Sequence, residues 1–184
     1  METTINLDEI KNIKKYIDEN VNDIRTISDD IVNEYTQVLD DIMKDINRDV
    51  INADLVSDAV LEKYFLELTN AIYFLGSKGE FLGLYDDLSK ANVKIKYNQA
   101  YSDNQIQNIA SGKKTTVDEN RAYAESASMN DSIVNAIYAR SFRIIKTKIE
   151  SANEMVKTLS KIISKRMNEK DYSDYVNPFN EGSN

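Results

Sequence analysis

Residues 10–46 read IKNIKKYIDENVNDIRTISDDIVNEYTQVLDDIMKDI, and this stretch decides the fold class. Apolar side chains recur along it at Ile10, Ile13, Ile17, Val21, Ile24, Ile27, Ile31, Tyr35, Val38, Ile42 and Ile46. The ten steps between them average 3.6 residues, which is the period of an amphipathic α-helix. A helix of this length cannot bury its apolar stripe against itself. It therefore predicts packing against a partner helix, from this chain or from another copy.

Two more helical stretches are expected after it. The first begins near Asp54 or Ser57, and three clustered glycines within it predict a kink, a break or a close helix contact. Beyond the glycines, the residues that we expect to form the core stripe are Leu84, Leu88, Ala91, Ile95 and Ile106. A turn at Gly112 leads to Thr116-Val117-Asp118-Glu119, whose capping-box spacing starts a helix that we expect to end near Met167.

The composition argues against catalysis. The chain of 184 residues contains no cysteine and no histidine, so disulfides, thiolate ligands and the usual general base are all missing. It also has no P-loop and no dinucleotide-binding motif. We therefore expect no enzyme activity, with no catalytic residues, no metal and no cofactor. No apolar run approaches the roughly 20 residues that span a bilayer, and we expect a cytoplasmic protein with no membrane partner.

These patterns predict an all-α fold of long antiparallel helical hairpins with coiled-coil-like packing, in an oligomer. The chain then divides into three parts. Residues 1–52 form an acidic N-terminal amphipathic helix, residues 53–170 a helical hairpin core with a basic region, and residues 171–184 an irregular C-terminal tail.

Charge is divided unevenly between the two halves. Residues 1–87 contain 8 basic and 20 acidic side chains, whereas residues 88–170 contain 15 basic and 8 acidic ones, a net charge of +7. An asymmetry of this kind indicates a polyanionic partner. Exposed bases with interleaved tyrosines could bind phosphates and stack on bases. The candidates opposite the core stripe and near the turn are Lys90, Lys94, Tyr97, Tyr101, Lys113, Lys114 and Arg121.

Purely structural roles are the alternative to DNA binding for some of these residues. Tyr97 and Tyr101 could instead form a second packing face against a neighbouring helix or subunit. A second group of bases shares its helix face with Glu150 and Glu154, which is typical of a solvated surface with intrahelical ion pairs. That group consists of Arg140, Arg143, Lys157, Lys161 and Lys165.

Three stretches between residues 64 and 170 resemble the UvsY-like recombination mediators of tailed phages. The first is LSKANVKIKY at 88–97, continuing through Ala100 and Tyr101. The second is GKKTTVDENRA at 112–122, a basic turn that opens a helix. The third is the long helix that contains Lys146-Thr147-Lys148 and continues through residues 155–159. The acidic first helix lies outside this resemblance.

The resemblance implies a non-catalytic homo-oligomer that binds single-stranded DNA. It also implies that the protein helps to load a recombinase in place of a single-strand-binding protein during phage recombination and repair, in the host cytoplasm. By the same resemblance, Lys94 and Lys96 are the nearest matches to the DNA-contacting bases of the family. The alternative is a coiled-coil structural or assembly protein, such as a scaffold or virion component, that acts only through protein contacts.

Overall fold

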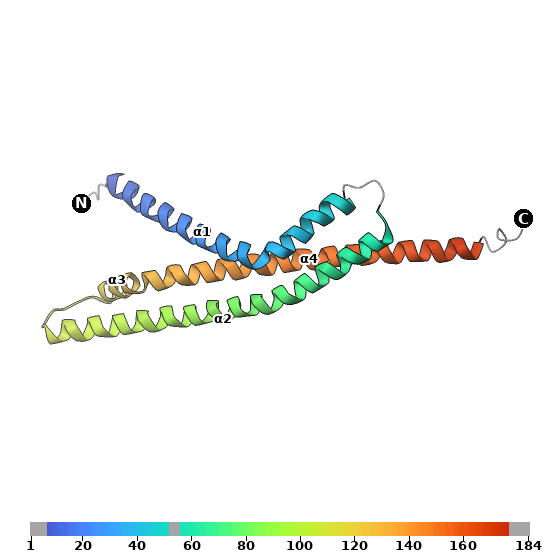
Figure 1. The fold of residues 1–184 in the computed structure, drawn as a ribbon. Helices are drawn as coiled ribbons and strands as arrows, with labels where there is room; N and C mark the ends of the chain where they lie inside the picture. The colour runs from blue at the N-terminus through green and yellow to red at the C-terminus, as the bar shows by residue number, and fades with distance from the viewer. Residues whose placement is uncertain (1–6, 52–55, 177–184) are drawn as a thin grey trace, which may run out of the picture. The chain divides into compact units, whose positions relative to one another are not determined.

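The computed structural model describes residues 7–51 and 56–176, and every regular element in them is helical. In chain order these are α1 (Leu7–Ile46), the short π-helix η1 (Asn47–Ile51), α2 (Asp58–Ala110), α3 (Val117–Ala127) and α4 (Met129–Val176) (Figure 1). No strand occurs within the described ranges. The predicted all-α class is therefore confirmed.

Two compact units divide the chain, and each is built from segments that lie far apart in the sequence. The first comprises Met1–Glu34 and Gly79–Ile145, and the second comprises Tyr35–Lys78 and Lys146–Asn184. Both units thus contain parts of α1, α2 and α4. The boundaries differ from the three-part division that the sequence suggests, because long helices contribute to two units at once.

In the first unit, small side chains let α1 pack closely on α4. Ser28 and Ser141 are fully buried. Their hydroxyl groups donate hydrogen bonds to the carbonyl of Ile137, at 3.3 and 2.9 Å. Beside them, the Arg140 guanidinium donates to Asp29 at 3.0 Å. Serine side chains satisfy their own hydroxyls on helix carbonyls here, so the contact contains no buried unpaired hydroxyl.

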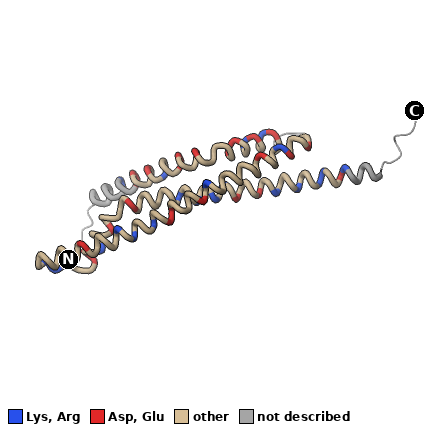
Figure 2. The backbone as a smooth tube through the Cα atoms, turned by 60° about the horizontal axis from the view of Figure 1, so that its bottom comes forward, with Lys and Arg blue, Asp and Glu red and all other residues tan. Residues whose placement is uncertain are grey.

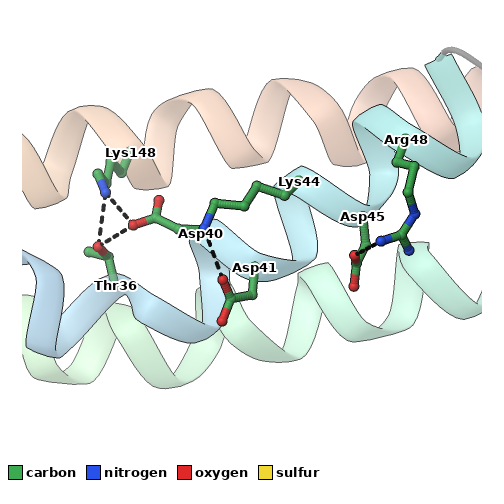
Figure 3. A network of polar contacts seen from close by, with 7 residues as sticks. All are labelled: Thr36, Asp40, Asp41, Lys44, Asp45, Arg48 and Lys148. Atoms are coloured by element: carbon green, nitrogen blue, oxygen red, sulfur yellow. Dashed lines mark hydrogen bonds and ion pairs between the residues drawn. The ribbon is translucent and has the colours of Figure 1, made fainter.

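The second unit has an apolar core contributed by all three long helices. Its fully or almost fully buried members are Leu39, Ile46, Leu61, Leu68, Leu75, Ala152 and Leu159. At the edge of this core, Lys148 of α4 donates to Thr36 at 2.9 Å and to Asp40 at 2.5 Å (Figure 3). Thr36 in turn donates to Asp40 at 2.7 Å. This three-residue network fixes α1 against α4 within the unit.

A second polar contact in this unit joins η1 to α2. Asp49 accepts hydrogen bonds from Arg48 at 2.6 Å and from the buried Tyr64 hydroxyl at 2.5 Å. These bonds, that of Arg48 first, lower the pKa of Asp49 to about 2 from an ordinary 3.8. The carboxylate thus stabilises the folded chain above pH 3.8, and this contribution disappears as the pH falls towards 2.

We therefore expect Asp49→Asn to remove part of the acid sensitivity of folding. The variant should be less stable than the parent at pH 6, and the difference should shrink as the pH falls from about 4 to 2. Urea unfolding followed by circular dichroism at several pH values measures this. A difference that stays constant over that range would contradict the coupling.

The helix signals read from the sequence are mostly confirmed. Thr116 caps α3, and the reciprocal bonds between Thr116 and Glu119 form the predicted capping box. Gly112 has a φ of +69°, which suits its place after the end of α2. The clustered glycines are Gly76, Gly79 and Gly83, and α2 continues through all three. Of the kink, the break and the close helix contact that they predict, the structure shows a close contact at Gly83, where an added Cβ would lie 3.3 Å from the Phe142 ring.

Three expectations differ from the structure. The helix that starts after Thr116 is interrupted at Ser128, and α4 then continues to Val176 rather than ending near Met167. The expected irregular tail is therefore helical up to that point, and its remainder, 177–184, lies outside the described residues. On α1, some predicted core positions point outwards, because Ser28, Val32, Thr36 and Leu39 form the buried face instead. The outward positions are Val21, Ile27 and Val38, at 55, 46 and 66% exposure.

Candidate nucleic-acid interface

The two faces of α2 in the first unit are reversed relative to the sequence prediction. The expected core residues Leu84, Leu88, Ile95 and Ile106 are between 53 and 66% exposed. The opposite side is inward, since Leu82 is 2% exposed and Asp86 is 7% exposed. The prediction was therefore wrong: this stripe is not part of the core that the chain forms by itself.

The tyrosines of the predicted DNA face lie on this inward side. Tyr97 and Tyr101 are half-buried, and their rings stack on each other with centroids 6.4 Å apart and planes 22° apart. Each ring already has an aromatic neighbour and little open surface. This arrangement resembles the packing-face alternative more than a platform for bases.

Lys90 is occupied by an internal network around a nearly buried carboxylate. Its ammonium group donates to Asp86 at 2.5 Å, and this hydrogen bond raises the pKa of Lys90. On the other side, the Asn135 amide of α4 donates to the same carboxylate at 3.1 Å and to Ser89 at 2.9 Å. Lys90 thus neutralises an inward charge and joins the contact between α2 and α4.

We accordingly expect Lys90→Glu to destabilise the protein rather than to report on DNA binding. The substitution would leave the Asp86 carboxylate without its cation and would add a like charge one helical turn away. The melting temperature should fall by several degrees in a thermal unfolding experiment. Lys113→Glu, at an exposed lysine with no acidic partner among the described residues, serves as the control and should change it little. Equal melting temperatures for the two variants would contradict this role of Lys90.

Lys96 is also engaged within the unit. Its ammonium group lies 2.8 Å from Asp131, at the start of α4, and Asn92 donates to the same aspartate at 2.7 Å. Lys94, which lies between these positions, is exposed and makes no ion pair with any described residue. Of the three lysines on this part of α2, Lys94 is therefore the one available to an external anion.

The turn between α2 and α3 presents two further available lysines on a fixed backbone. Lys113 and Lys114 are exposed, and neither pairs with an acid in the part of the chain that the structure describes. The Lys113 amide donates to the carbonyl of Asn108 at 2.9 Å, which closes the end of α2. The next helix is anchored by the buried Asn120, which accepts a hydrogen bond from Asn104 at 2.7 Å.

Arg121 completes the predicted set, one helical turn into α3. Its guanidinium lies 3.7 Å from Asp118, and both side chains are largely exposed, at 60 and 92%. An exposed pair at this distance is weak, so Arg121 remains accessible to a phosphate. Lys113 and Lys114 thus lie in the turn before α3, and Arg121 lies within α3. Along the described part of α1, Asp and Glu outnumber Lys and Arg (Figure 2).

Sequence reasoning missed the residues that hold the basic region in place. Asp86 pairs with Asn135, which lies 49 residues away, and Lys96 pairs with Asp131. No local pattern reveals such contacts, because they depend on the register of two long helices. Among the described residues, no group of three or more potential ligands is placed to hold a metal ion. None of the described helices is both long and apolar enough to cross a membrane.

Comparison with known proteins adds no relative: no family model, no curated protein and no solved structure matches the chain.

Proposed function

We propose that the protein is a non-catalytic single-stranded DNA-binding protein of the recombination-mediator type. The observation that carries the proposal is a set of exposed lysines without acidic partners among the described residues, namely Lys94, Lys113 and Lys114. They lie in the region of residues 88–170, whose net charge is +7. The resemblance of residues 88–122 and of the long last helix to UvsY-like mediators supports the same function.

The mode of binding follows from which side chains are free. Tyr97 and Tyr101 stack on each other and face inwards, so base stacking on them contributes little. Lysines on the surface instead contact phosphates, and such contacts carry little sequence information. We therefore propose binding that is sensitive to salt and tolerant of sequence. Several copies bound to one strand would together hold it more tightly than one copy, because linked contacts raise the effective concentration of the strand. The complex would then serve a recombinase by displacing single-strand-binding protein.

Fluorescence anisotropy of a labelled single-stranded oligonucleotide tests the proposal. Three phosphate contacts on a single strand predict that log K falls with log salt with a slope of about −2 per protein chain. Raising salt from 50 to 200 mM should then weaken binding by roughly 15- to 20-fold. No binding of the single strand at low salt, or binding of duplex DNA alone, would contradict the proposal.

A second candidate is a structural or assembly protein that acts only through protein contacts. The exposed apolar side chains along α2 favour it, since five leucines and isoleucines are more than half exposed in the first unit: Leu84, Leu88, Ile95, Ile106 and Ile109. Surface leucines and isoleucines in a row mark contact sites for proteins more often than for DNA. Self-association without any DNA binding in the anisotropy experiment would select this candidate.

A further inference from the structure

The outward face of α2 in the first unit carries an apolar row that no described side chain covers. We call it the outer seam and define it as Phe81, Leu84, Leu88, Ala91 and Ile95. Phe81 is 63% exposed, Leu84 58%, Leu88 66% and Ile95 53%. The inward face of the same helix has its own buried residues, such as Leu82. The outer seam is therefore a second apolar face with no role in the packing of its own unit.

The spacing of the outer seam is that of a coiled coil. Its members follow one another at intervals of 3, 4, 3 and 4 residues. This alternation puts them at the two core positions of successive heptads, which face a single partner helix. The next such positions, Asn98, Ser102 and Gln105, are polar, so the apolar part of the seam is short and centred near Leu88.

Charged side chains along one flank of the outer seam change sign along the helix. The flanking positions, one residue before Phe81, Leu88 and Ile95, are Glu80, Asp87 and Lys94. Asp87 is 80% exposed, and the Lys90 ammonium lies 3.9 Å from its carboxylate. Lys94 is exposed and unpaired with respect to the described acids. The flank thus offers an acid and a base, seven residues apart, to an external helix.

We propose that the outer seam binds the same seam of a second copy of this chain, with the two helices antiparallel. In this register Leu88 packs against Ala91 of the second copy, and Leu84 packs against Ile95 of the second copy. The two-fold symmetry then places Asp87 beside Lys94 of the second copy and Lys94 beside Asp87 of the second copy. Every apolar member except Phe81 meets an apolar partner.

Charge selects this register over its neighbours. A shift of one heptad in either direction places Asp87 beside Asp87 of the second copy, or Lys94 beside Lys94 of the second copy. In a parallel pair the flanking partners of Asp87 and Lys94 are Asn92 and Gln99, which carry no charge. The shift that places Asp87 beside Asp87 also gives two attractive pairs, between Glu80 and Lys94 of the second copy, together with that one repulsive pair. Only the antiparallel register proposed here gives two attractive pairs and no repulsive pair, so charge complementarity specifies both orientation and register.

Two single charge reversals test the proposal without DNA. Light scattering should show that the parent protein doubles its mass from 21.0 kDa with rising concentration. Asp87→Lys and Lys94→Asp should each weaken this association by at least about tenfold, because each places two like-charged pairs in the homodimer. Mixing the two variants should restore it, since one chain then supplies two lysines and the other two aspartates.

The mixture distinguishes the loss of a specific charge pairing from damage to the helix by the substitutions. Circular dichroism first shows that both variants retain the helical content of the parent. If the mixture associates no better than either variant alone, the register is wrong. A parent protein that stays at 21.0 kDa at every concentration overturns the self-association itself. Lys94 belongs to both proposals, but Lys113 and Lys114 lie outside the outer seam and its flank. Their contribution to DNA binding is independent of either outcome, so failure here is distinct from failure of the proposed DNA binding.

A spin-label distance tests the orientation independently. The chain has no cysteine, so Asp103→Cys provides a single labelling site on the exposed side of α2. In the proposed dimer the two labels are separated by 27 residues of helical rise, which is about 40 Å at about 1.5 Å per residue. A parallel pair would bring them within about 20 Å of each other. A short distance would overturn the antiparallel arrangement.

Discussion

Replacing both Lys113 and Lys114 with glutamate is expected to weaken single-stranded DNA binding by about 100-fold at 50 mM salt. The attraction between two opposite unit charges in contact in water raises the affinity by roughly fivefold. Reversing a charge loses that factor and adds a repulsion of similar size. Two reversals give a loss on the order of 100-fold once screening is included.

The double variant should fold like the parent, which makes the change in affinity interpretable. Both lysines are exposed and have no acidic partner within the described ranges. The turn is held by backbone bonds, by Gly112 and by the capping box of α3, none of which involves the lysine side chains. Glutamates just before the start of a helix also interact favourably with its N-terminal dipole.

A matched control separates a local site from the attraction of the whole basic region. Lys161→Glu with Lys165→Glu changes the net charge by the same amount, on an exposed part of α4. Anisotropy titrations of the two double variants should show a large loss for the first and a loss of less than about fivefold for the second. Equal losses would show that net charge, and not the turn, attracts the DNA.

Local signals in the sequence predicted local structure well. The start of α3 follows from Thr116 and Glu119, whose side chains satisfy each other's backbone amides. The end of α2 follows from Gly112, which adopts a positive φ that other residues avoid. These features depend on contacts within about four residues, so a single sequence contains all the information they require.

The orientation of α2 could not be predicted in the same way. The helix is apolar on more than one side, with Leu82 inward and Leu84 and Leu88 outward, so periodicity alone gives no unique core face. The choice depends on contacts such as Asp86 with Asn135 and Gly83 beside Phe142. For the candidate site, the same reversal places Tyr97 on the inward side of α2. Lys94 and the two turn lysines remain available.

Leu82→Ala should destabilise the fold by about 2–4 kcal/mol, whereas Leu88→Ala should cost less than about 0.5 kcal/mol in dilute solution. Leu82 is 2% exposed, so its truncation leaves a cavity that the packed helices cannot fill. Leu88 is 66% exposed and loses few contacts within its own chain. Both variants make the same chemical change six residues apart on one helix, so helix propensity affects them equally.

Urea unfolding of both variants, followed by circular dichroism at low and high protein concentration, decides which face of α2 is the core. A core formed by the stripe predicted from the sequence would reverse the order, with Leu88→Ala the more damaging change. Concentration adds a second distinction. If the outer seam pairs with a second copy, the cost of Leu88→Ala should grow with protein concentration, because only the parent gains stability from association. The cost of Leu82→Ala should show no such growth, since that side chain is buried within a single chain.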